Sequence, residues 1–210
     1  VALTHRLLDA RILPVYGAAL MGIYLWGLLG ISSWLQPRPP IALTIGVFFV
    51  LHSRWFADAS RDLWRWDVRA LLWDGVADQY AVGTAFQPSM FGVLLIASIS
   101  AFLHDKSRLA AILLVLAAAM HPTYLLSAGL LAGAYMGVRF AQDKDARGAW
   151  EIGAIAALGL IPVALHTYNT FGPTSPALYR QAQALLAVAR IPHHALPQVW
   201  FNWTTVLKIG

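Results

Sequence analysis

The chain has 210 residues, of which 59% are hydrophobic and only 12% are charged, against about 25% charged in an ordinary globular protein. So few charges cannot cover a water-exposed surface, which excludes a disordered tail, a coiled coil and a nucleic-acid-binding domain. The formal net charge of +5 suits loops that meet anionic lipid headgroups, so we expect membrane lipids and no nucleic acid as partners. Because cysteine is absent, the chain has no disulfide and no cysteine nucleophile.

Long apolar runs predict an all-α, polytopic transmembrane helix bundle. The first run would be about 35 Å long as a helix, enough to cross a bilayer. We expect about six complete spans and a truncated seventh, forming a single transmembrane domain over residues 1–210. The chain starts at Val1 and stops inside its last run, so we expect it to be a fragment of a longer protein. The runs are Leu13–Leu35, Ile41–Leu51 with a continuation to Ala57, Phe86–Leu103, Leu109–Met120, Thr123–Val138, Ala149–His166 and the truncated Gln198–Gly210.

Two short neighbouring runs, Leu109–Met120 and Thr123–Val138, predict a hairpin. Leu109–Val138 is 30 residues long, too long for one span and short for two. The flanking loops His104–Arg108 and Arg139–Arg147 are both compact and basic, so by the positive-inside rule we place both on the cytoplasmic side. An even number of crossings must then separate them. His121-Pro122 becomes the tip of the hairpin, because proline disfavours helix at the residue before it.

This parity places three segments together on the extracytoplasmic face. We expect the membrane to be a bacterial inner membrane. The segments are the interfacial helix and loop at residues 54–85, the His121-Pro122 tip, and the loop at residues 167–197. A raw count of Arg and Lys favours the reverse orientation. The sequence therefore indicates that the three segments share one face more clearly than it indicates which face that is.

Residues 54–80 have the pattern of an amphipathic helix that lies in the headgroup plane. Apolar residues recur every three or four positions from Leu63 to Tyr80, and the opposite face carries Asp and Arg. On the simplest interpretation these charges pair with each other. Alternatively, Asp74 and Asp78, one helical turn apart, point into a cavity, where they would hold a divalent cation or act as a general base.

Two further clusters are candidates for binding a polar headgroup. His121 and Tyr124 flank the hairpin tip, where both side chains can bond a headgroup, although a wet interfacial position explains them equally well. His193 and His194 lie in a proline-bounded loop. There they can converge into a metal or phosphate ligand set with Arg180 nearby, although adjacent histidines alone are a weak metal signal.

Other features have simpler interpretations. A stripe of small residues favours close packing against another helix. Asp143 and Asp145, on either side of Lys144, are interpreted as part of a solvated charge cluster. Glu151 is the only acid inside a predicted span, which argues against a proton-coupled pump. The stripe consists of Gly129, Gly133 and Gly137.

Several short motifs resemble those of multispan GT-C type glycosyltransferases and related bacterial membrane proteins. They cover about Asp74–Leu126 and Tyr179–Trp200, a minority of the chain. The motifs are Gln79-Tyr80, Phe86-Gln87-Pro88-Ser89 before Phe91-Gly92, the charged turn His104–Arg108, Met120-His121-Pro122-Thr123-Tyr124, and Arg190-Ile191-Pro192-His193-His194 followed by Pro197 and Trp200.

The resemblance implies transfer of a sugar from a polyprenyl-phosphate carrier on the extracytoplasmic face. An acid in an early loop would serve as base or metal ligand, a role open to Asp74 or Asp78. The family's acid usually follows the first span, and this chain departs from that pattern. The expected substrate-binding groups are Gln87, His121, Tyr124, Arg180, His193 and His194. The same groups suit two other classes, a transporter or flippase for a lipid-linked or amphipathic solute and a non-catalytic subunit of a membrane complex.

Overall fold

In the computed structural model, the part of the chain that can be described is entirely helical apart from its turns and connectors. No β-strand occurs within it, which confirms the predicted all-α class. The described residues are 13–36, 40–65, 88–142, 144–172, 175–190 and 196–201.

Within these described ranges, three helices are long and apolar enough to cross a membrane, which indicates a membrane protein. They are α2 (Leu13–Leu35), α8 (Leu125–Ala141) extended by the short turn η4 (Pro122–Tyr124), and α9 (Ala146–Phe171). The predicted count of six complete spans is therefore not supported. Most of the predicted apolar runs do form helices, but the other helices are too short to cross the hydrocarbon core by themselves.

A fourth crossing would require two helices that are joined at an angle. Helices α3 (Ile41–Leu51) and α4 (Arg54–Trp64) turn by 69° at their junction. The Ser53 side chain caps α4 by accepting a hydrogen bond from the Phe56 backbone over 3.1 Å. Helix α4 ends at Trp64, where Arg65 has the left-handed φ of 53°. The helix predicted over residues 54–80 is thus interrupted at Arg65, and residues 66–87 lie outside the described part.

Two short helices form the centre of the bundle. The 3₁₀ turn η3 (Pro88–Gly92) leads into α6 (Val93–Leu103), and α7 (Ser107–Met120) follows. At 1.5 Å per residue, α7 is only about 21 Å long. Both helices contain buried alanine, α6 also contains buried serine, and they pack between α2 on one side and α8 and α9 on the other. Neighbouring helices therefore cover much of these short helices, while one face of α7 remains exposed.

Small residues allow the helices to approach closely. A Cβ atom added at Gly27 of α2 would lie 3.1–3.2 Å from the Ala97 backbone of α6. Within the core, the Ser98 hydroxyl donates to the Ala110 carbonyl over 2.9 Å and lies 3.2 Å from the Tyr135 hydroxyl. The Tyr135 ring stacks on Phe102, with 4.1 Å between centroids. These contacts join α6, α7 and α8.

The predicted glycine stripe on α8 takes no part in this packing. No described atom outside the helix backbone lies within 4 Å of a Cβ atom built at Gly129, Gly133 or Gly137. Close approach to neighbouring helices occurs instead at Gly153, beside Met136, and at Gly159, beside Val115. The stripe remains an open face of α8, alongside exposed leucines.

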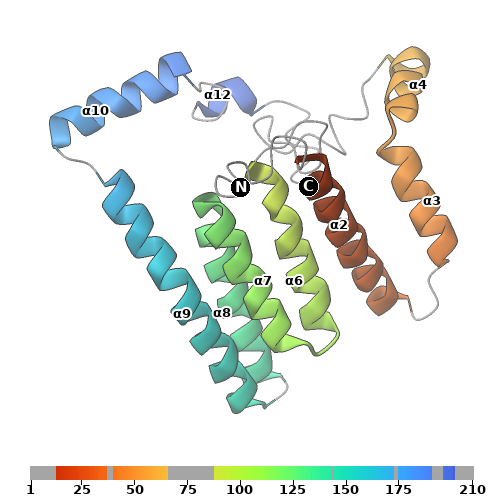
Figure 1. Cartoon of the computed structure of the whole chain (residues 1–210), viewed down its shortest axis with the longest axis horizontal. Coiled ribbons are helices and arrows are strands. Elements are labelled where there is room, and N and C mark those ends of the chain that lie inside the picture. The colour runs from red at the N-terminus through yellow and green to blue at the C-terminus, as the bar shows by residue number, and fades with distance from the viewer. Residues whose placement is uncertain are drawn as a thin grey trace.

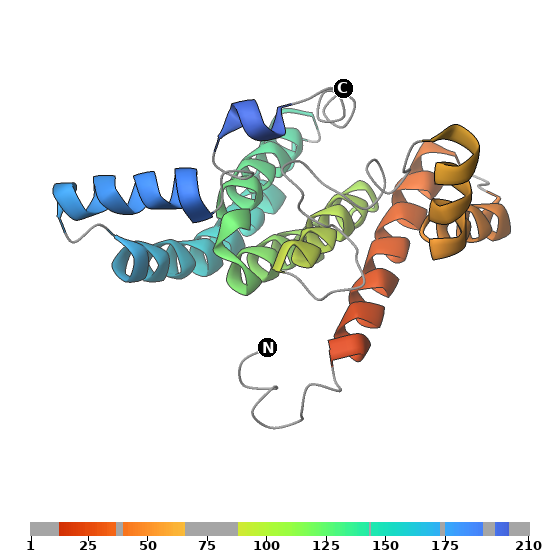
Figure 2. The ribbon, with the colours of Figure 1, turned by 90° about the horizontal axis from the view of Figure 1, so that it is seen from above.

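The bundle has two distinct ends (Figure 1). The connector end carries the links from α6 to α7 and from α8 to α9, and the tip end carries His121–Tyr124. Helices α3 and α4 lie at one side of the bundle and α9 and α10 at the other (Figure 2). Figure 1 shows α4 and the C-terminal helices at the same end as the tip. The C-terminal helices are α10 (Pro176–Leu185), the π-helical turn η5 (Leu186–Arg190) and α12 (Pro197–Trp200). Most of the predicted seventh run lies outside the described residues.

Candidate functional site

The hairpin tip is formed by a break in the helix at His121. Helix α7 ends at Met120, and His121 takes an extended conformation with φ of −149° before Pro122 opens η4. Proline cannot donate the backbone hydrogen bond that would continue α7. The chain then turns back along α7 as α8, in agreement with the predicted hairpin.

The Tyr124 hydroxyl is hydrogen-bonded to the backbone of Gly92. A Cβ atom at residue 92 would lie 2.9 Å from this hydroxyl oxygen, so glycine leaves the room that the tyrosine needs. The bond ties the start of α8 to the start of α6. Tyr124 therefore has a structural role at the tip in addition to its predicted contact with a headgroup.

His121 is partly exposed beside this contact. Its Nδ1 atom is hydrogen-bonded to the Thr123 hydroxyl, and its ring lies 6.4 Å from that of Tyr124 in an edge-on arrangement. Among the described residues no partner is assigned to the Nε2 atom, which leaves this atom able to bond an incoming group. Of the two predicted tip residues, His121 is thus the better placed to contact a ligand.

Arg180 lies on α10, away from the hairpin tip. The hydroxyl of Ser175 caps this helix by accepting a hydrogen bond from Leu178 N–H over 3.2 Å. Arg180 is exposed, and α10 packs mainly against the turn that follows it. The structure places Arg180 and His121 at the same end of the bundle but describes no bond between them.

The remaining predicted site residues lie outside the described part of the chain. They are Asp74, Asp78, Gln87, His193 and His194. Within the described ranges, no group of three or more His, Asp or Glu side chains is arranged to hold a metal ion. The proposed divalent cation therefore depends on residues whose placement the structure does not give.

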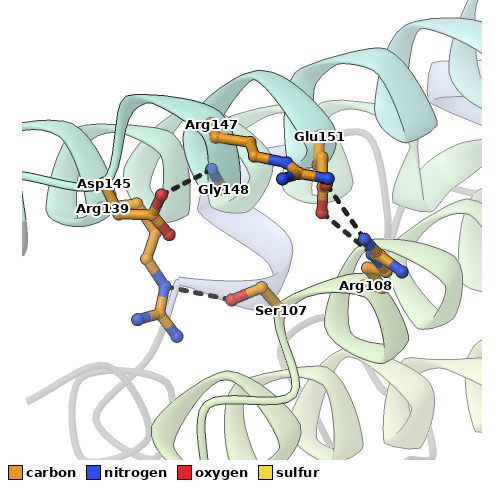
Figure 3. A network of polar contacts seen from close by, with 7 residues as sticks. All are labelled: Ser107, Arg108, Arg139, Asp145, Arg147, Gly148 and Glu151. Carbon is orange, nitrogen blue, oxygen red and sulfur yellow. Dashed lines mark hydrogen bonds and ion pairs between the residues drawn. The ribbon is translucent and has the colours of Figure 1, made fainter.

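The connector end holds a polar network that the sequence analysis missed (Figure 3). Arg108 Nε and Nη2 donate to the two carboxylate oxygens of Glu151 over 2.9 and 3.0 Å, and Arg147 Nε donates to the same carboxylate over 3.3 Å. Two guanidinium groups thus share one carboxylate. In the sequence, this network was indicated by the spacing of Arg147 and Glu151, which lie four residues apart on a helix.

Arg139 supplies the second part of this network. Its Nε donates to the Ser107 hydroxyl over 3.0 Å, and its Nη2 donates to the Asp105 carboxylate over 2.9 Å. The guanidinium carbon also lies 5.1 Å from the centre of the Phe102 ring. The Arg139 side chain is only 12% exposed, whereas that of Asp105 is 86% exposed, so the contact with Ser107 is better shielded from water than the ion pair.

The ion pairs of this network favour the charged forms of its side chains. The hydrogen bond to Glu151, reinforced by the charge of that carboxylate, raises the pKa of Arg108 above its usual value. Asp145 accepts a hydrogen bond from Gly148 N–H over 2.9 Å and so caps α9. The predicted solvated charge cluster thus has a structural role at Asp145, while Asp143 lies outside the described residues.

Comparisons of the chain with protein-family models, with curated proteins and with solved structures find no match.

Proposed function

We propose that the chain belongs to a membrane glycosyltransferase that transfers a sugar from a polyprenyl-phosphate donor on the extracytoplasmic side of a bacterial inner membrane. The short motifs described above support the type of reaction. The observation that carries the proposal is the common location of the hairpin tip, α4 and α10 at one end of an apolar bundle (Figure 1). The charged connectors lie at the other end.

This arrangement suits a substrate that is part lipid and part phosphate. A polyprenyl tail stays in the hydrocarbon, so its phosphate reaches a site at headgroup depth. Such a site needs cations for the phosphate and a carboxylate for the acceptor hydroxyl. In this proposal Arg180, His193 and His194 neutralise the phosphate, and His121 with Tyr124 and Gln87 positions the headgroup.

The acid in this proposal is Asp74 or Asp78. Either carboxylate would accept the proton of the acceptor hydroxyl as the new glycosidic bond forms, or hold a divalent cation beside the phosphate. The carrier phosphate leaves with the electrons of the bond that breaks. Arginine and histidine near that phosphate stabilise the negative charge that develops on it.

The test is transfer from a radiolabelled polyprenyl-phosphate sugar in reconstituted membranes. We expect the double variant His193→Ala, His194→Ala to lower the transfer rate about a hundredfold or more, in the range for loss of a charge-stabilising group. His166→Ala, on the exposed surface of α9, is a matched control and should leave the rate unchanged. Unchanged transfer in the double variant would remove the assignment.

A transporter or flippase for the same kind of lipid-linked solute is the alternative from another class. Glu151 is tied to two arginines at the connector end, which gives it a structural role and leaves less reason to assign it to ion coupling. The alternative predicts movement of labelled lipid-linked sugar across the membrane without formation of a glycosidic product.

The open glycine stripe favours a further possibility, that the chain is a subunit packed against a partner helix. Gly129, Gly133 and Gly137 leave a surface on which another helix can lie closely. Crosslinking through cysteine introduced at Gly133 would detect this partner. A chain that remains monomeric and uncrosslinked in its native membrane would argue against it.

A further inference from the structure

The connector end contains a pocket of about 410 Å³ beside the ion pairs of Figure 3. This volume lies within the usual range for small-ligand sites, about 300–1,000 Å³. The start of α7 forms one wall through Lys106, Arg108 and Leu109, and Arg139 and Glu151 reach the pocket from α8 and α9. The pocket is thus built by three helices at one end of the bundle.

The acids around this pocket already have partners. Asp105 accepts from Arg139, Asp145 accepts from Gly148 N–H, and Glu151 accepts from Arg108 and Arg147. Since Arg108 and Arg147 share one carboxylate, this group of three side chains keeps a net positive charge.

Lys106 adds a positive charge that balances the carboxylate of Asp145, so the pocket lining together with Arg147 keeps one net positive charge. Lys106 is exposed, lines the pocket, and forms no ion pair with any residue in the described part of the chain. Its side chain also provides no hydrogen bond to cap α7, so the positive end of that helix faces the same region. Among the described residues, the ammonium group of Lys106 is therefore the cation of this pocket that is available to an anion.

An apolar stripe on α7 leads away from the pocket. Leu109, Ile112 and Leu116 are exposed and recur at helical spacing along one face of α7. Trp150, in the first turns of α9, is also exposed, and tryptophan is enriched at the boundary between headgroups and hydrocarbon. A ligand that fits both features has an anionic head and an apolar tail.

We propose that this pocket binds the phosphate of an anionic phospholipid, with the acyl chains lying along Leu109, Ile112 and Leu116. Lys106 contacts the phosphate directly, and Arg108, which also lines the pocket, supplies additional N–H donors. The proposal rests only on the chain being embedded in a membrane, and it is independent of sugar transfer. It places a lipid site at the end of the bundle opposite the hairpin tip.

Titration calorimetry with the whole chain in a neutral detergent tests this site. The probe is dihexanoyl phosphatidylglycerol, and the comparison ligands are glycerol 3-phosphate, inorganic phosphate and dihexanoylglycerol. We expect the phospholipid to bind at least about tenfold more tightly than each comparison ligand, because they lack either the tails or the phosphate. No binding of the phospholipid, or equal binding of free phosphate, would overturn the proposal.

Two lysines provide a matched pair of variants. Lys106→Gln and Lys144→Gln each remove one exposed positive charge at the connector end, but only Lys106 lines the pocket. One juxtamembrane charge contributes about fivefold in affinity. We expect Lys106→Gln to raise the Kd about fivefold and Lys144→Gln to change it less than about twofold. Equal effects would mean non-specific attraction and would overturn the site.

Glu151→Gln should strengthen phospholipid binding instead of weakening it. The substitution removes the carboxylate that competes for Arg108 and Arg147, so the phospholipid should bind about fivefold more tightly. A purely structural role for Glu151 predicts weaker binding, because the pocket would lose its shape. Weaker binding in this variant, together with equal effects of the two lysine variants, would leave no support for the proposal.

Discussion

The guanidinium of Arg139 lies 2.9 Å from the carboxylate of Asp105, which joins the end of α8 to the connector between α6 and α7. Arg108 and Glu151 make a second link between α7 and α9 at the same end. These contacts hold the two charged connectors together, as the hairpin at His121 requires. The topology of the central helices thus has direct side-chain support.

Arg139 should contribute more to stability than its exposed neighbours. Replacing it with glutamine removes its bonds to Ser107 and Asp105. We expect a loss of about 1–3 kcal/mol, mainly from the largely buried guanidinium and its bond to Ser107, because the Asp105 carboxylate is exposed and contributes little. Arg139→Lys should recover part of this loss, because lysine keeps the charge but lacks the planar fork. Thermal unfolding in detergent measures both variants.

Arg147→Gln is the control for this prediction. The Arg147 side chain is 86% exposed, and an exposed ion pair contributes little. The melting temperature of the Arg147→Gln variant should therefore stay close to that of the unmodified chain. Equal losses for Arg139→Gln and Arg147→Gln would show that the shielded contacts of Arg139 carry no special weight.

Much of the fold could be predicted from the sequence, but the number of spans could not. Apolar composition correctly indicated helices, and Pro122 correctly indicated a break and reversal at His121. The runs that became α6 and α7 are as apolar as a true span, so composition did not distinguish them. Their shortness is tolerated because α2, α8 and α9 surround them, and that tertiary packing is not visible in a local hydropathy pattern.

Helix packing between α2 and α6 should depend on Gly27. A leucine there would place side-chain atoms against the Ala97 backbone, which cannot move aside easily, and we expect a loss of about 1–3 kcal/mol from overpacking. Gly133→Leu is the matched substitution on the open face of α8, and it should not lower the melting temperature of the isolated chain. A large loss at Gly133 would show that this face is packed.

Tyr124 and His121 should have different roles at the tip, the first in stability and the second in transfer. Tyr124→Phe removes the hydrogen bond to the Gly92 backbone and should cost about 1 kcal/mol of stability. His121→Ala should leave the melting temperature nearly unchanged but lower transfer from the lipid-linked donor. Melting curves and transfer rates on both variants test this division. Loss of stability in His121→Ala alone would reverse the assignment.

The candidate site could be predicted only in outline. The sequence grouped the hairpin tip with the segment that contains Arg180, and both lie at the tip end. It missed the structural bond of Tyr124, because residue 92 is a glycine whose importance depends on a contact across the bundle. It also missed the network at the connector end, because Arg139 and Glu151 find their partners Ser107 and Arg108 on a different helix.

Cysteine labelling tests the topology most directly, because the chain has no cysteine of its own. Single cysteines would replace Lys106, Lys144 and Thr123, and an impermeant maleimide would be added to sealed vesicles of known orientation. The structure predicts that Lys106→Cys and Lys144→Cys are labelled from the same side and Thr123→Cys from the opposite side. Labelling of Lys106→Cys and Lys144→Cys from opposite sides would contradict the hairpin and separate the groups of the proposed site.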